Sequence, residues 1–326
     1  MKPKNFGVQI SLLRALLRSR CALHKISAPL LFILTFFSFS QLLSAAVVWH
    51  PLPEEAYQFG KHYPEAQKLL FAFDYGHALI YEKLLAKKAD NNRVIENPLA
   101  TILDILAKPN DPKVKSHETD IAPNYTFLFS LAVDLFDWSH LLHQFILDVM
   151  VAVPDKKEME KRVHKIFEIY KANKPVVITD ECKSMLFMDG HYFSKAFRRT
   201  FPSLNLLIWS YHWFQIKLYE ALMNPSLEQQ RQGVQDVLLQ FKEMISDLPD
   251  SADFDMMPGT FEEAPQFSRM FPKIAASFDN NHMLHDIVSD MLTSNRVARH
   301  EVRWEGLKFA RMAWDPNAFR KPNCGE

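Results

Sequence analysis

Two segments of the chain carry the same pattern of aspartate and histidine. The segment DWSHLLHQFILDVM covers residues 137–150, and DNNHMLHDIVSDML covers residues 279–292. Each contains Asp-x-x-His-x-Leu-His, followed by a second aspartate five residues after the last histidine. Carboxylate and imidazole groups bind transition metals, and a spacing of three places them one helical turn apart on one face. The repeated pattern predicts a metal site that uses both segments.

The polar residues of each segment share one face if the segments are helical. At roughly 100° per residue, Asp137, His140 and His143 fall together and apolar residues fill the opposite arc. Any surface helix has a polar face, but solvated faces are usually rich in Lys and Glu. Neither of these faces contains Lys, Arg or Glu. We therefore expect both faces to be covered.

Glu82 and Glu220 stand in apolar stripes of two other segments, PEAQKLLFAFDYGHALIYEKLL (64–85) and PSLNLLIWSYHWFQIKLYEALM (202–223). The residues that share a helical face with Glu220 include Trp209 and Trp213. A carboxylate is almost never fully buried without a partner, because desolvating it costs roughly several kcal/mol. We expect each glutamate to meet a cation, a metal ion or a hydrogen-bond donor.

The candidate metal ligands alternate along the chain between lone glutamates and Asp-x-x-His pairs. They are Glu82, Asp137, His140, His143, Glu220, Asp279, His282 and His285. This order resembles the ferritin-like carboxylate-bridged di-iron proteins, in which two helices each give a Glu and two each give Glu-x-x-His. The chain departs from that pattern in having Asp within the pairs and in adding His143 and His285. The resemblance implies one or two metal ions held between helices.

Carboxylate with imidazole suits iron, manganese or zinc rather than calcium. With iron we expect oxygen-dependent oxidation, and with zinc a metal-activated water and hydrolysis. A buried Glu, His and Asp hydrogen-bond network without metal is the alternative. His285-Asp286 also resembles the dyad of the HD metal-dependent phosphohydrolases, for which His212 and Asp315 would be the further ligands.

A second hypothesis is a non-enzymatic helical binding module. The aromatic-rich segment LNLLIWSYHWFQIKLYEALM (204–223) would then line a groove for an apolar ligand or a protein partner. Stoichiometric metal in the purified protein favours the first hypothesis, and a folded protein without metal favours the second.

The chain as a whole is predicted to be all-α, because it has only eight glycines and its long segments show helical periodicity. We expect helices near 64–88, 97–108, 123–151, 155–172, 179–200, 203–223, 226–247, 278–294 and 297–313. Residues 64–85 match 202–223 at an offset of 138, and the aspartate and histidine segments match at 142. These offsets predict an internal duplication with pseudo-two-fold halves at 47–186 and 187–326, packed as one domain.

The first 46 residues have the order of a secretory leader. Six basic and no acidic residues accompany the apolar run PLLFILTFFSFSQLLSAA (29–46), which ends in small residues. We expect cleavage before Val47 and export to the periplasm or outside the cell. A mitochondrial presequence and an uncleaved membrane anchor through residues 29–46 are the alternatives.

The rest of the chain has 38 acidic against 32 basic residues, since six of the 38 basic residues lie in the leader. This balance argues against nucleic-acid binding, which requires a basic surface. The two cysteines outside the leader, Cys182 and Cys324, are enough for one disulfide in an oxidising compartment.

Overall fold

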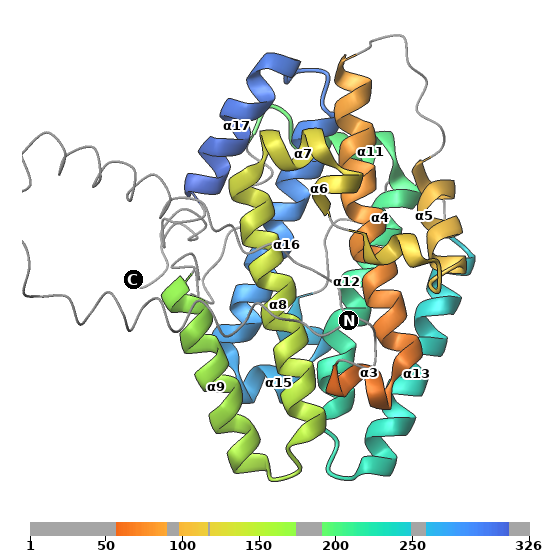
Figure 1. Cartoon of the computed structure of the whole chain (residues 1–326), viewed down its shortest axis with the longest axis vertical. Coiled ribbons are helices and arrows are strands. Elements are labelled where there is room, and N and C mark those ends of the chain that lie inside the picture. The colour runs from red at the N-terminus through yellow and green to blue at the C-terminus, as the bar shows by residue number, and fades with distance from the viewer. Residues whose placement is uncertain (1–56, 90–97, 117, 174–190, 249–258, 313–326) are drawn as a thin grey trace, which may run out of the picture. The chain divides into compact units, whose positions relative to one another are not determined.

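The computed structural model describes residues 57–89, 98–116, 118–173, 191–248 and 259–312. Within these ranges every regular element is a helix (Figure 1), which confirms the predicted all-α class. The elements are α3 (Gln58–His62), α4 (Pro64–Ala89), α5 (Pro98–Ala107), the short 3-10 helix η2 (Pro112–Lys115), α6 (Glu118–Ile121), α7 (Pro123–Leu128), α8 (Ser130–Ala152), α9 (Lys156–Asn173), α11 (Ala196–Thr200), α12 (Pro202–Leu222), α13 (Leu227–Ser246), α14 (Thr260–Glu263), α15 (Pro265–Met270), α16 (Pro272–Thr293) and α17 (Arg299–Met312).

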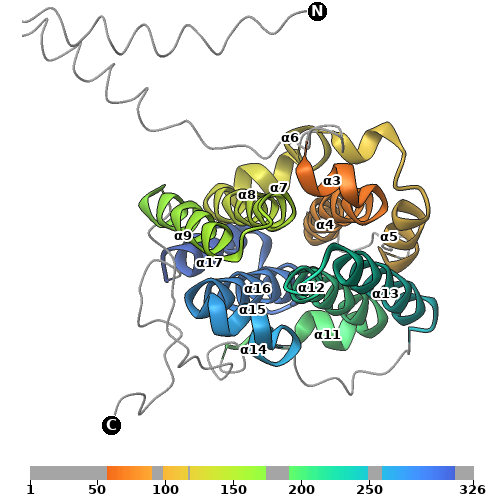
Figure 2. The ribbon, with the colours of Figure 1, turned by 90° about the horizontal axis from the view of Figure 1, so that it is seen from below.

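Four long helices, α4, α8, α12 and α16, form the centre of the helical bundle. Seen end on, they surround a common middle, while α9 and α13 lie at the outside (Figure 2). Helix α16 packs against α4 and α8, α12 packs against α8, and α13 runs along α12. The central helices therefore bury residues on several faces, which explains why α12 is apolar around most of its circumference.

Proline and serine mark where several helices begin. Prolines occupy the first turn of α7, α12, α15 and α16, where the missing N–H has no intrahelical partner and the fixed φ suits a helix. Ser226 caps α13, because its hydroxyl accepts a hydrogen bond of 3.2 Å from the backbone N–H of Gln229.

The single helix predicted over 123–151 is wrong, because the chain breaks at Phe129 into α7 and α8. Phe129 leaves helical geometry with φ −114° and ψ 29°, and its ring is buried in the core. The break keeps its backbone hydrogen bonds, since the N–H of Phe129 donates to Tyr125 and its carbonyl accepts from Val133. The apolar periodicity continues through the break and therefore does not reveal it.

The helix predicted over 179–200 is wrong for the part that the structure describes, which begins at 191. Only Ala196–Thr200 is helical there, as α11. Lys195 has φ 63°, in the left-handed region, and so stops a helix from continuing through it. The carboxylate of Asp290 on α16 accepts the backbone N–H groups of Lys195 at 2.7 Å and Phe197 at 2.9 Å. This contact fixes the turn and the start of α11.

Some predictions concern residues outside the described ranges. These are the leader at 1–46, its apolar run at 29–46, and Cys182 and Cys324. Among the helices of the described ranges, none is both long and apolar enough to cross a bilayer.

Gly306 gives a direct test of packing between α17 and the break at Phe129. A Cβ at Gly306 would lie 2.6 Å from the Phe129 ring, whereas a Cβ at Gly76 would lie 3.5 Å from Ile102, at ordinary contact distance. We expect Gly306→Ala to lower the free energy of unfolding by about 1–3 kcal/mol through overpacking. Gly76→Ala, also within a helix, is the control and should be neutral or stabilising. Denaturant unfolding of both variants measures the difference, and equal effects would contradict the close packing.

The pH dependence of stability tests the burial of the Asp290 carboxyl group. Burial raises its pKa to about 6, although backbone hydrogen bonds from Phe197 and Lys195 act in the opposite direction. An acid whose pKa is higher in the folded state binds more protons there, so stability is lost as pH rises through about 4 to 6. Asp290→Asn should reduce this slope, measured as the free energy of unfolding against pH. Asp148→Asn, at the matching position of α8, is the comparison; an unchanged slope in Asp290→Asn would contradict the assignment.

Candidate functional site

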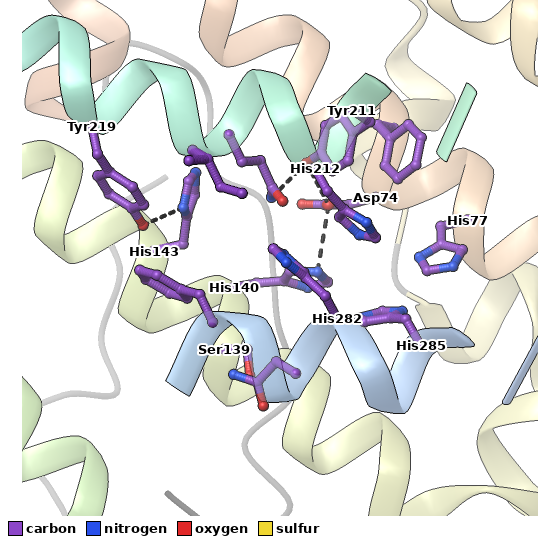
Figure 3. A pocket seen from close by; sticks show the side chains of 15 residues that line it. Asp74, His77, Ser139, His140, His143, Tyr211, His212, Tyr219, His282 and His285 are labelled. Carbon is purple, nitrogen blue, oxygen red and sulfur yellow. Dashed lines mark hydrogen bonds and ion pairs between the residues drawn. The ribbon is translucent and has the colours of Figure 1, made fainter. Parts of the chain in front are cut away.

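A pocket lined by six histidines lies between α4, α8, α12 and α16 (Figure 3). We call it the histidine pocket. Its free volume is about 30 Å³. Its polar lining residues are Asp74, His77, Ser139, His140, His143, Tyr211, His212, Gln215, Tyr219, Asn281, His282 and His285. Each of the four central helices contributes at least one histidine, so the site depends on the packing of all four.

Helical spacing brings these side chains together. Asp74 and His77 are three residues apart on α4, as are His140 and His143 on α8, and each pair therefore shares a helix face. His282 and His285 have the same spacing on α16, and α12 adds His212.

Burial keeps most of these imidazoles uncharged. Burial first, and the neighbouring His140 second, lower the pKa of His77 and His143 to about 3. The pKa values of His212 and His285 are also well below the ordinary value, because of burial first and nearby histidines second. These four histidines are neutral at physiological pH, and a neutral imidazole is the form that binds a metal.

Asp74 is the carboxylate of the pocket lining. Its Oδ1 lies 3.5 Å from Nε2 of His140 and accepts a hydrogen bond of 3.1 Å from the Tyr211 hydroxyl. Burial raises the pKa of Asp74, while His140 and Tyr211 act to lower it. Beside this pair, the rings of His212 and His282 stack with their centroids 4.0 Å apart. Figure 3 shows these four side chains together at the middle of the pocket.

Two tyrosines hold the outer histidines. The Tyr219 hydroxyl forms a hydrogen bond with Nδ1 of His143, and the Tyr81 hydroxyl lies 3.4 Å from Nδ1 of His285. In the part of the chain that the structure describes, the buried Nε2 atoms of His77 and His143 have no hydrogen-bond partner. Such a nitrogen is costly in the interior, and it is the atom that a ligand would engage.

The structure brings together only half of the predicted ligands. His140, His143, His282 and His285 line the histidine pocket, and Glu82, Asp137, Glu220 and Asp279 do not. The two glutamates have other partners at the starts of short helices. Glu82 accepts a hydrogen bond of 2.8 Å from the backbone N–H of Tyr125 on α7, and Glu220 accepts from Gln266 at 3.0 Å and Phe267 at 3.2 Å on α15.

The two aspartates also engage short helices. Asp279 accepts hydrogen bonds from the backbone N–H of Thr260, at 3.0 Å, and from its hydroxyl, at 2.6 Å. Asp137 hydrogen-bonds with Glu118 at the start of α6. Burial raises the pKa of Glu118 well above its ordinary value, and the carboxylates of Asp137 and Asp74 raise it further. Helices α6 and α14 are thus anchored by aspartates of the repeated pattern.

Two residues of the histidine pocket, Asp74 and His77, were missing from the predicted metal ligands, and His212 was named only as a further ligand beside His285-Asp286. The sequence did contain a signal, because Asp74-Tyr75-Gly76-His77 is a third Asp-x-x-His. At the offset of 138, Asp74 matches His212, so the chemical type changes between the matched segments and a search for identical residues overlooks both.

Most aromatic residues of α12 are buried in the interior, and Trp209 is partly buried. Tyr211 stacks on Phe73 with ring centroids 3.4 Å apart, and Tyr219 stacks on Phe267 at 4.4 Å and Phe278 at 5.2 Å. Trp213 is also buried. These rings pack the core and the walls of the histidine pocket.

Comparisons with known proteins add no assignment: no family model, no curated protein and no solved structure matches the chain. Among the described residues, no three His, Cys, Asp or Glu side chains are grouped so as to hold a metal ion as they stand.

Removing either glutamate contact should lower the stability of the fold and leave the histidine pocket intact. Glu220→Ala removes the acceptor at the start of α15 and should lower the free energy of unfolding by roughly 0.5–2 kcal/mol, the usual range for a lost helix cap. Glu82→Ala should have a similar effect at α7. Denaturant unfolding tests both, and Glu65→Ala on the exposed surface serves as the control. Equal stability of all three variants would show that the two contacts contribute little.

Proposed function

We propose that the histidine pocket binds a transition-metal ion through Asp74, His140, His212 and His282. One ligand comes from each central helix, and the four side chains already form two adjacent pairs, at 3.5 Å between Asp74 and His140 and at 4.0 Å between the rings of His212 and His282. Small rotations of these side chains are needed for the ligand atoms to converge on one ion.

The observation that carries this proposal is the concentration of six imidazoles and the Asp74 carboxylate around one small space. A hydrogen-bond network without metal would be expected to satisfy its own nitrogens, because buried polar groups nearly always find partners. The Nε2 atoms of His77 and His143 lack such partners among the described residues. Three imidazoles and one carboxylate suit iron, manganese or zinc.

The chemistry of the proposed centre depends on the ion. Iron or manganese would support oxidation with a dioxygen species, and zinc would support hydrolysis through an activated water. The protein is then a metal-dependent enzyme of one of these two kinds. Its own residues exclude bulk water, hold the ligands in place and balance one positive charge with Asp74.

We further propose that the helical body is an internal duplication of 47–186 and 187–326. Matched contacts support it: Glu82 with α7 corresponds to Glu220 with α15, and the pair Tyr81 and His285 corresponds to Tyr219 and His143. In the latter pairs each tyrosine contacts the other half's histidine, so both halves would be needed to build one pocket.

Metal analysis of full-length protein purified without an affinity tag tests the proposed centre. We expect about one iron, manganese or zinc ion per chain. His212→Ala and His282→Ala should weaken metal binding by more than about a hundredfold, the upper limit for losing a merely supporting residue. Glu82→Gln, outside the pocket, is the control and should retain the metal. A folded wild-type protein that takes up none of these metals would refute the proposal.

We also propose that residues 1–46 are a cleaved leader, on the sequence pattern alone. Intact-mass measurement of exported protein should show a chain that begins at Val47. Exported material that begins at Met1 would contradict this.

A further inference from the structure

We infer that the ligand or substrate that reaches the proposed metal ion is a small anion of two or three atoms, such as peroxide or superoxide. This inference rests on the proposed metal centre and adds the size and charge of what binds there. It also favours chemistry on dioxygen species over hydrolysis of an organic substrate.

The size limit comes from the free space of the histidine pocket, about 30 Å³. A cavity needs roughly 10–15 Å³ of free volume to hold one water molecule. The pocket therefore has room for about two waters. Because the ion takes part of this space, a molecule of two or three atoms fits beside it and a metabolite does not.

The walls of the pocket oppose widening. Phe73 stacks on Tyr211 with an interplanar angle of 10°, and Phe136 stacks on His285 with centroids 3.6 Å apart. All of these side chains are buried. Close-packed interiors accommodate extra volume only by straining side chains and shifting the backbone. A larger substrate would have to displace several rings at once.

The preference for an anion comes from the net charge of the proposed centre and from the Nε2 atoms of His77 and His143. A divalent ion with one carboxylate and neutral imidazoles leaves a net positive charge in a buried site. His77 and His143 are 5% and 8% exposed, and their Nε2 atoms have no hydrogen-bond partner among the described residues. When the Tyr219 hydroxyl donates to Nδ1 of His143, the ring proton is on Nε2, which becomes a donor.

A second cavity of the same size adjoins the histidine pocket. It also offers about 30 Å³ and shares Asp74 and His140 with the histidine pocket. It extends towards Ser116 and Glu118, beside η2 and α6. A molecule of two or three atoms can also occupy this space, whereas a larger one cannot.

Cobalt(II)-loaded full-length protein tests the inference, because the visible absorption of cobalt responds to a new ligand. Azide, a linear anion of three atoms, should change the spectrum and saturate, while benzoate at the same concentration should not. His143→Gln should bind cobalt as before but weaken the azide response by about tenfold, the loss expected for one hydrogen bond to an anion.

Three results would overturn the inference. A benzoate response equal to that of azide would show that the pocket admits larger ligands. Cobalt bands that azide leaves unchanged would show that no small anion reaches the ion. Absence of cobalt binding would refute the metal centre itself, so the two proposals fail in different ways.

Discussion

The arrangement of this chain depends on how a layer of polar side chains is accommodated between four helices. The histidines of the pocket come from α4, α8, α12 and α16 and are buried or largely buried. Burial lowers the pKa of His77, His143, His212 and His285. Their uncharged rings stack on one another and on aromatic neighbours, as His77 does on His285 with centroids 4.5 Å apart. Burying these polar side chains costs desolvation free energy. A bound metal ion would offset this cost and stabilise the fold, because metal binding is coupled to folding.

The carboxylates around the pocket have a different structural role. Glu220, Asp279 and Asp290 each accept backbone N–H groups from a short helix or turn, at α15, α14 and α11. A negative charge at a helix N-terminus is favourable, because the unpaired N–H groups and the helix dipole both point towards it. The long helices thus position short ones through single side chains, and those short helices are too brief to be stable alone.

The sequence was most informative about features that depend on periodicity within one segment, namely helix bounds and the buried face of each helix. It placed α4, α9, α12 and α13 within one or two residues and predicted that His140, His143, His282 and His285 face the interior. It also predicted that Glu82 and Glu220 need partners, but it could not identify these as backbone N–H groups more than 40 residues away. The ring of Phe129, at the break between α7 and α8, packs close to Gly306 on α17, and no local pattern reveals a contact between such distant segments. Asp74 was missed, and His212 was named only beside His285-Asp286, because the matched segments differ there in residue type.

X-ray absorption of the zinc-saturated, full-length protein tests the central claim most directly, because it reports the atoms bound to the metal. The account predicts four nitrogen and oxygen ligands at about 2.0–2.2 Å, with the outer scattering of three imidazole rings. Zinc that shows a shell of oxygen ligands without imidazole scattering would contradict a metal centre in the histidine pocket.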